Sequence, residues 1–307
     1  MNAPTPKSAF TAFPPRLPAV PRGRVRLGSD AHRTLMCATM LTTHDPYKPA
    51  LIDWPKLDPV TQNRITSLPI WDIAVATEGR ASMNVSTYAE GIADPLLKSA
   101  VEMNAFEEAR HKLVLGDMVQ AYGIELVPEP AYVRPRDPEW AFMVTGFSEC
   151  IDSFFGFGLF RIAKDSGFFP PELVDTFEPV MREEGRHILF FVNWVEWHRR
   201  TMPLWRRPWF AVKVAAVWAF LIWERIDMAK GLGDGNTRAE ESNFTLNGSK
   251  ELGVEIEFPE LAAICLAEND RRLGVYDARL KRPKFVPGAM RLALKVLGKG
   301  KLLAAQA

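Results

Sequence analysis

A five-residue pattern that occurs twice restricts what this 307-residue chain can fold into. It reads Glu-Glu-Ala-Arg-His at 107–111 and Glu-Glu-Gly-Arg-His at 183–187. Positions three apart share one face of a helix, so each copy places a carboxylate beside an imidazole. The chain has only 5 histidines, and chance is a poor account of two in identical settings. The repeat therefore predicts two metal-binding pairs, Glu108 with His111 and Glu184 with His187.

Proline and glycine positions divide the chain into helical segments. A connection over 123–138 carries four prolines, and its 16 residues can extend to about 50 Å, enough to run back along a bundle. A Gly/Asn-rich loop is expected over 231–248, and a basic amphipathic tail ends the chain. The expected helices cover 69–93, 95–122, 138–164, about 170–198, 208–229 and 258–273.

Helical hairpins built from these segments place further carboxylates opposite the motifs. If the chain turns near residue 93, Glu108 lies 15 residues beyond the turn and Glu78 lies 15 residues before it. If it turns again near 167, Glu184 lies 17 residues beyond, and its mirror position 150 is next to Glu149. At 1.5 Å per residue, all four carboxylates stand roughly 22–27 Å from their turns. Glu90 competes with Glu78, but it is too near the turn to face Glu108.

Residues 69–198 resemble the ferritin-like di-iron carboxylate superfamily. The resemblance lies in one Glu from each of two helices and a Glu-x-x-His from each of two others. The Glu-Glu-x-Arg-His spelling looks most like its oxygen-activating branch, which includes acyl-carrier-protein desaturases and bacterial di-iron monooxygenases. The resemblance implies an all-α, ferritin-like four-helix bundle with one long crossover, plus extra C-terminal helices. It also implies six ligands to two iron ions, with Glu108 and Glu184 bridging: Glu78, Glu108, His111, Glu149, Glu184 and His187.

The same resemblance implies a second layer around the ligands. The acidic residue before each bridging glutamate, Glu107 or Glu183, would hydrogen-bond a ligand histidine and fix its tautomer. Arg110 and Arg186 would belong to this layer. The plainer interpretation is a surface ion pair within each motif, Glu107 with Arg110 and Glu183 with Arg186.

The expected activity is that of an O₂-dependent di-iron oxidase or oxygenase, with Glu108 and Glu184 in the catalytic centre. It would hydroxylate, desaturate or otherwise oxidise a small hydrophobic organic substrate. Two iron ions, or manganese with iron, would be the cofactor. Electrons would come from a separate ferredoxin or flavin reductase. The alternative is a ferroxidase or iron-handling protein without an organic substrate. A third hypothesis is a non-catalytic protein, either a bundle whose site is structural or a membrane-associated accessory subunit.

Room for the substrate is expected beside the aromatic third helix. Gly156 and Gly158 lie there next to Phe154 and Phe155, and a mid-helix glycine costs about 1 kcal/mol against alanine. A cavity opened by these glycines would suit an apolar molecule. Most aromatic residues of this helix are expected to be ordinary core.

Composition limits the partners. The 38 basic and 37 acidic side chains leave a net charge of +1, which gives no reason to expect a nucleic-acid partner. The 3 cysteines, Cys37, Cys150 and Cys265, are far apart and are read as buried or free thiols in a reducing, cytoplasmic setting. The sequence leaves open whether the chain forms a homodimer.

Three regions are expected: an extended or partly disordered Pro/Arg-rich arm over 1–60, the di-iron bundle over 61–200, and additional helices over 201–307 packed on it. The apolar stretch 209–223 is short for a membrane span, so a buried helix is favoured over membrane contact. Flanking arginines leave an interfacial role open. His32, His44 and His198 lack a carboxylate at ligand spacing and are expected to be surface or structural residues.

Overall fold

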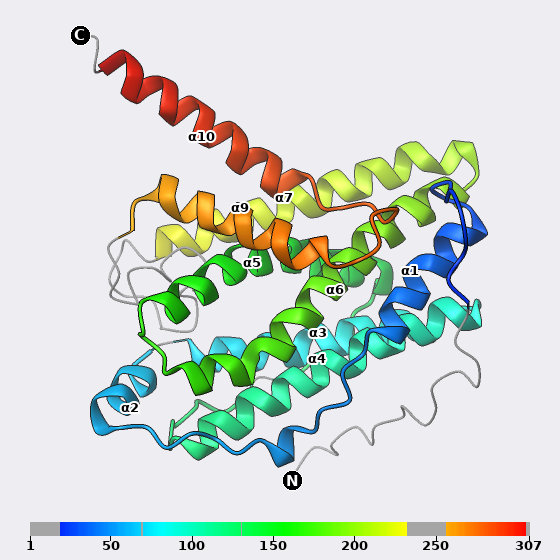
Figure 1. Cartoon of the computed structure of the whole chain (residues 1–307). Helices are drawn as coiled ribbons and strands as arrows, with labels where there is room; N and C mark the ends of the chain where they lie inside the picture. The colour runs from blue at the N-terminus through cyan, green and yellow to red at the C-terminus, as the bar shows by residue number, and fades with distance from the viewer. Residues whose placement is uncertain (1–18, 69, 130, 232–255, 305–307) are drawn as a thin grey trace.

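The computed structural model describes residues 19–68, 70–129, 131–231 and 256–304, and it is helical with no strand in these residues (Figure 1). Residues 1–18 of the expected arm and the expected loop from residue 232 on lie outside the described residues. The α-helices are α1 (Asp30–Thr42), α2 (Pro59–Thr66), α3 (Trp71–Glu90), α4 (Pro95–Ala121), α5 (Pro138–Asp165), α6 (Pro171–Thr201), α7 (Arg207–Gly231), α9 (Phe258–Gly274) and α10 (Phe285–Ala304). Two short 3₁₀ helices are η1 (Pro49–Leu51) and η2 (Leu204–Arg206).

Aspartate caps define where α4 and α5 begin. The Asp94 carboxylate accepts a hydrogen bond from the backbone N–H of Leu97 at 2.9 Å, and Pro95 occupies the first turn. The Asp137 carboxylate does the same for Trp140 at 2.9 Å, ahead of Pro138. The helices expected over 95–122 and 138–164 are therefore confirmed to within a residue at each end.

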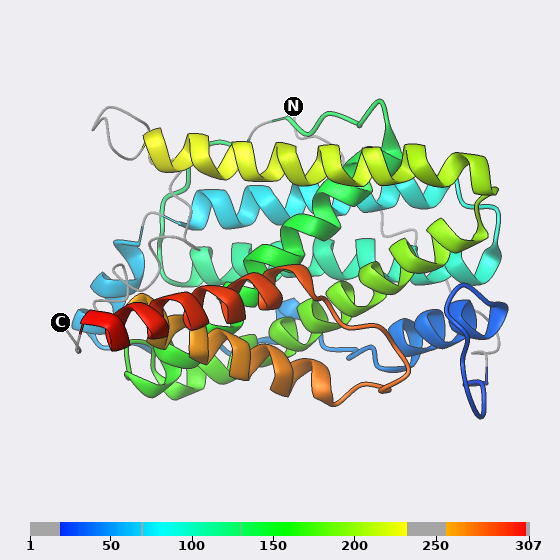
Figure 2. The same cartoon turned by 90° about the horizontal axis from the view of Figure 1, so that it is seen from above.

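Four long helices form the centre of the molecule. α3 and α4 are neighbours joined by a short turn, α5 and α6 are neighbours joined by another, and contacts between α3 and α5 and between α4 and α6 unite the pairs. Residues 122–137 connect α4 to α5. α1 lies against α4 and α6, while α7 and α9 both cover α5 (Figure 2).

The buried core has two large apolar clusters. One contains residues of α1, α4, α5 and α6, with Phe142 packed edge to face against both Phe191 and Trp194. The other joins α2 to α4, α5 and α6 through residues such as Ile65, Met118 and Leu173. Each cluster draws on several helices, so side-chain packing sets how the long helices lie against one another.

The expectation of an extended arm to residue 60 is wrong for 30–42, which form α1. The Ser29 hydroxyl caps this helix by accepting from the His32 N–H, and Leu35, Met36 and Met40 are fully buried. Proline frequency suggested the arm, but no proline stands between Pro21 and Pro46. An amphipathic segment with a good cap formed a helix once the other helices supplied a surface to bury it.

The expectation that 209–223 is a buried helix is only half right. Within α7, Phe210, Val217 and Leu221 are buried against the body, but Trp209 is 73% exposed and Trp223 61% exposed. Hydrophobicity in the sequence does not distinguish a helix covered on all sides from one covered on a single side. Among the described residues, none of the helices has the length and hydropathy that a membrane crossing requires.

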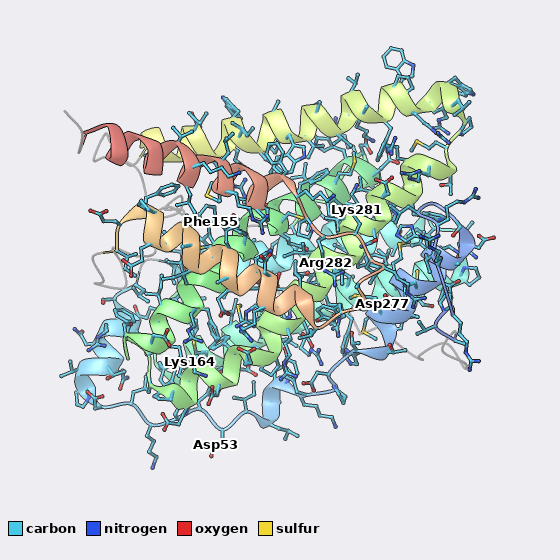
Figure 3. All side chains as sticks on the ribbon, turned by 45° about the horizontal axis from the view of Figure 1, so that its top comes forward. Asp53, Phe155, Lys164, Asp277, Lys281 and Arg282 are labelled. Carbon is cyan, nitrogen blue, oxygen red and sulfur yellow. The ribbon has the colours of Figure 1, made fainter. Side chains whose placement is uncertain are left out.

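The expectation that Gly158 opens room for a substrate is wrong. A Cβ at this position would lie 2.3 Å from the Cys265 Sγ, so the glycine lets α9 approach α5 closely. Phe154 is buried in a cluster with Cys265 and Val286, and Phe155 packs against that cluster beside α9 (Figure 3). A Cβ at Gly156 would meet no heavy atom within 4 Å. Three of the four expected substrate residues therefore serve helix packing.

These two glycines should respond to alanine in opposite directions. Gly158→Ala should lower the free energy of unfolding by roughly 1–3 kcal/mol, because the methyl group overpacks the α5–α9 contact. Gly156→Ala should raise it by up to about 1 kcal/mol through helix propensity. Urea unfolding of both variants measures this, and equal effects would contradict the packing role of Gly158.

Glu196 ties the segment before α10 to α6. Its side chain is 6% exposed, accepts from Lys281 Nζ at 2.6 Å and contacts Arg200. Beside it, Asn193 accepts from the Lys281 N–H at 2.8 Å and pairs with His32 Nε2 at 2.8 Å, which confirms a structural role for His32. Burial opposes ionisation of Glu196, but Lys281 and Arg200 outweigh it and lower its pKa to about 2.

This shift makes a pH-dependent contribution to stability. Because the folded pKa of Glu196 lies below its unfolded value near 4.5, its stabilisation is complete above about pH 5 and is lost as the pH falls toward 2. Wild type should therefore lose more stability than Glu196→Gln between pH 6 and pH 3. Melting temperatures across this range test it, and parallel curves for the two proteins would contradict it.

Candidate metal centre

The motif residues and their mirror positions meet at one level inside the four long helices. Two groups of side chains each bring their ligand atoms within 4.8 Å of one another. The first contains Glu78 of α3, Glu108 and His111 of α4, and Glu184 of α6; the second contains Glu108, Glu149 of α5, and His187 of α6. The six side chains predicted from the motifs and the hairpin arithmetic therefore lie together, and their role as ligands stays a prediction. Either group could hold a metal ion.

Glu108 is the side chain that the two groups share. Its Oε1 lies 2.7 Å from His187 Nδ1, and its Oε2 lies 4.0 Å from His111 Nδ1. It thus reaches toward both histidines, as a bridging carboxylate does. Glu184 Oε1 lies 3.1 Å from His111 Nδ1, while its Oε2 accepts a hydrogen bond from Ser153. The bridging role expected of Glu184 stays a prediction.

A second layer of charged groups surrounds these residues, and its pairs cross between helices. The Nε2 of His111 in α4 pairs with Glu183 of α6 at 2.9 Å, and the Nε2 of His187 in α6 pairs with Glu107 of α4 at 2.8 Å. The arginines follow the same rule. Arg110 pairs with Glu183, and Arg186 with Glu107.

All four members of this layer are at most 4% exposed, so the alternative of solvated surface pairs is wrong. Within one motif the glutamate and arginine are farther apart, at 3.7 Å for Glu107 and Arg110. Each glutamate accepts the expected hydrogen bond from a histidine, but this histidine belongs to the opposite motif.

These hydrogen bonds leave the inner nitrogens of the histidines without a partner. Carboxylates only accept, so each Nε2 carries a proton, and in its neutral form each ring presents the Nδ1 lone pair to the inner cluster. His111 Nδ1, His187 Nδ1 and Glu149 Oε1 are buried and make no hydrogen bond, although Glu108 Oε1 is 2.7 Å from His187 Nδ1. Buried lone pairs that converge in this way are typical of ligands to a cation, so the donor set fits metal ions.

The carboxylates of the inner cluster perturb one another. Burial together with Glu108 and Glu184 raises the pKa of Glu78 to about 8, although the nearby His111 ring opposes this rise. Burial and the same two neighbours raise the pKa of Glu149 well above its usual range. Burial opposes protonation of His111, but the nearby carboxylates of Glu183, Glu184 and Glu78 outweigh it and raise its pKa.

Cations would relieve this crowding. Ionised glutamates at the four positions carry a charge of −4 in a site from which water is largely excluded, and two divalent ions would neutralise it. The second layer is already balanced, because each of its glutamates faces an arginine. The excess negative charge is thus confined to the inner cluster.

The segment between α1 and η1 closes the outer side of the second layer, which the sequence did not indicate. His44 Nδ1 donates to Glu107 at 2.6 Å, and the Tyr47 hydroxyl donates to Glu183 at 3.3 Å. Arg186 donates to the Thr43 carbonyl, and Arg110 donates to the Asp45 carbonyl at 2.7 Å. The sequence has no carboxylate at ligand spacing from His44, but Glu107 lies beside it in space.

Two polar neighbours of the inner cluster were also missed. Asn104 Nδ2 donates to Glu108 Oε1 at 3.2 Å from one turn earlier in α4. Ser153 of α5 donates to Glu184 at 3.1 Å. Asn104 could have been found, since it lies four residues before a predicted ligand on the same face.

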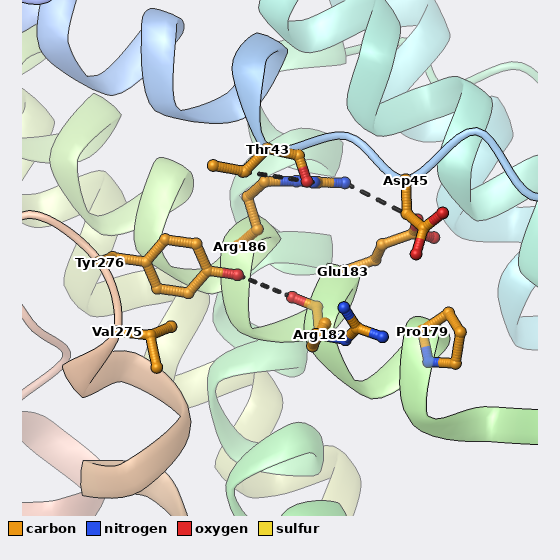
Figure 4. Close-up of a pocket in the computed structure, with 8 residues that line it drawn as sticks. All are labelled: Thr43, Asp45, Pro179, Arg182, Glu183, Arg186, Val275 and Tyr276. Atoms are coloured by element: carbon orange, nitrogen blue, oxygen red, sulfur yellow. Dashed lines mark hydrogen bonds and ion pairs between the residues drawn. The ribbon is translucent and has the colours of Figure 1, made fainter. Parts of the chain in front are cut away.

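A hollow of about 230 Å³ lies outside the second layer (Figure 4). Glu183 and Arg186 form part of its wall, and the Tyr276 hydroxyl donates to the Arg182 carbonyl across it at 3.1 Å. The hollow thus lies against the outer face of the layer whose inner face holds the histidines. It is lined by Thr43, Asp45, Pro179, Arg182, Glu183, Arg186, Val275 and Tyr276.

Comparisons with models of protein families, with curated proteins and with solved structures found no match to this chain.

The crossed pairs should make Glu107 important for stability. Glu107→Gln should lower the free energy of unfolding by roughly 3–5 kcal/mol, because it leaves Arg186 buried without its counter-charge. Glu183→Gln should cost a similar amount, since it has the equivalent partners. Glu102→Gln on the exposed face of the same helix is the control and should stay within about 0.5 kcal/mol of wild type. Urea unfolding in the presence of a chelator measures all three, and a loss no larger than that of Glu102→Gln would contradict the pairing.

Proposed function

We propose that this chain is a ferritin-like four-helix-bundle protein that binds two iron ions and uses them with O₂ to oxidise a small hydrophobic organic substrate. The observation that carries the proposal is the convergence of four carboxylates and two outward-tethered histidines from α3, α4, α5 and α6. This donor set, with a glutamate from two helices and a Glu-x-x-His from the other two, is that of di-iron and di-manganese carboxylate proteins.

The choice of metal rests on the ligand chemistry. Carboxylate oxygen with imidazole nitrogen suits iron or manganese, and the described part of the chain places no cysteine within either group. Cys37, Cys150 and Cys265 are free and buried, and burial raises the pKa of the Cys265 thiol to about 12. Iron is the proposed occupant, with manganese in place of one iron as a variant.

When bound, the iron ions would supply the redox chemistry with O₂. A hydroxylation balances when the substrate C–H and O₂ take two electrons and two protons to give an alcohol and water. The protein supplies the site for this reaction. Glu107 and Glu183 hold each imidazole in one tautomer and orientation, and Glu108 spans the two groups.

The second layer also offers a place for protons to pass. The Tyr47 hydroxyl and the His44 ring contact Glu183 and Glu107, and the hollow of Figure 4 adjoins Glu183. The two electrons would come from a separate ferredoxin or flavin reductase, because the sequence carries no motif that binds an iron–sulfur cluster or a flavin. Since Phe154, Phe155 and Gly158 are packed, the substrate class now rests on the resemblance and the apolar surroundings of the cluster.

The first test is metal content per chain after anaerobic loading with ferrous iron, by mass spectrometry. Wild type and the Glu102→Gln control should retain about two irons. Glu108→Ala and His187→Ala should lose at least half of the metal, since each removes a ligand, while circular dichroism confirms their folding. Retention of no iron by folded wild type would overturn the proposal.

The second test separates an oxygenase from a ferroxidase. Loaded protein receives a chemical reductant, isotopically labelled O₂ and an apolar alkyl or aromatic compound. A labelled or desaturated product that requires both reductant and O₂ supports the oxygenase. O₂ consumption in proportion to added ferrous iron, without an organic product across a panel of such compounds, assigns the iron-handling alternative instead.

A further inference from the structure

The outward face of α7 is apolar up to Ile226, and the partly exposed Glu224 and the exposed Asp227 lie at its end. Between Trp209 and Ile226, each residue classed as exposed in the structure is an apolar one. The large members are Trp209, Val212, Phe220, Ile222, Trp223 and Ile226, which are 36–73% exposed. Contiguous apolar surface of this extent is unusual on a protein surrounded by water alone and marks an interaction site.

Two basic residues in the middle of the same helix face the other way. Lys213 Nζ lies 2.7 Å from Glu139, and Arg225 Nη2 lies 2.8 Å from Asp152, so both reach inward to α5. A helix on a water-facing surface normally has the opposite arrangement, with its charges outward and its apolar stripe inward. α7 is therefore built for an apolar environment on its outer side.

A strongly basic segment lies beside this face. The last acidic residue of the chain is Asp277, and eight lysines and arginines follow it. α10 belongs to this segment, and it begins against α7, with the rings of Phe285 and Trp218 4.2 Å apart. Arg291 and Lys295 of α10 are exposed, as are Leu292 and Val296. Figure 1 shows both helices along the upper side of the molecule.

We infer that α7 and α10 form a membrane-binding surface that lies in the headgroup region of a bilayer containing anionic lipid. Exposed indoles next to aliphatic side chains suit the boundary between headgroups and acyl chains, and basic residues nearby suit anionic headgroups. A second copy of the chain fits less well, because twofold pairing of this face would bring two basic segments together. The inference does not rest on the proposed oxidase activity.

Co-sedimentation of the full chain with vesicles tests the inference. Phosphatidylcholine vesicles are compared with vesicles that also contain phosphatidylglycerol, at low and high salt. Wild type should bind the anionic vesicles, and high salt should weaken the binding. Trp209→Gln with Trp223→Gln should reduce partitioning by on the order of tenfold or more. Arg291→Gln with Lys295→Gln should reduce it by on the order of tenfold, on anionic vesicles only.

The control is a double variant on the far side of the molecule. Leu51→Gln with Val60→Gln removes apolar side chains that are 77% and 69% exposed on η1 and α2, and it should bind as wild type does. If the tryptophan variant does not fold, Ile222→Gln with Ile226→Gln replaces it. No binding by wild type, or equal binding by the α7 variant, would overturn the inference. Self-association without vesicles that the α7 variant abolishes would also overturn it, by assigning the face to a second copy.

Discussion

The crossed pairing of Glu107 with His187 and Arg186, and of Glu183 with His111 and Arg110, is the constraint on which the rest of the structure depends. Burying one ionised side chain without a partner costs several kcal/mol. Glu107 and Arg110 of α4 each have their nearest counter-charge on α6, and the reverse also holds for Glu183 and Arg186. The two helices must therefore lie side by side with their motifs level, which sets the register of the whole centre.

This pairing has a chemical consequence in the middle of the molecule. Because the outer nitrogen of each histidine donates to a glutamate, the inner nitrogen points its lone pair at the carboxylates of the four long helices. The balanced second layer lies on the outer side of this inner cluster, in which the excess negative charge is confined. Such a cluster is stable when cations or protons occupy it. The raised pKa of Glu78 and the Nδ1 atoms without a hydrogen bond both indicate this need for positive charge.

Ion pairing also determines which face of α7 is turned to the surface. Lys213 and Arg225 of α7 find their counter-charges on and next to α5 and not in solvent. That leaves Trp209 and Trp223 on the outer side, beside a C-terminal segment without acidic residues. Charge pairing inside and apolar exposure outside thus arise together on this helix.

The sequence by itself determined the four long central helices, the two Glu-x-x-His pairs and, through hairpin symmetry, Glu78 and Glu149. These follow from the rise and repeat of a helix, which are local properties. Only the tertiary structure decided that Glu107 serves His187, that His44 and Tyr47 close the second layer, that 30–42 form a buried helix, and that Gly158 packs against Cys265. Those contacts join residues far apart in the chain, and they depend on helix packing angles and register that spacing along one helix does not specify.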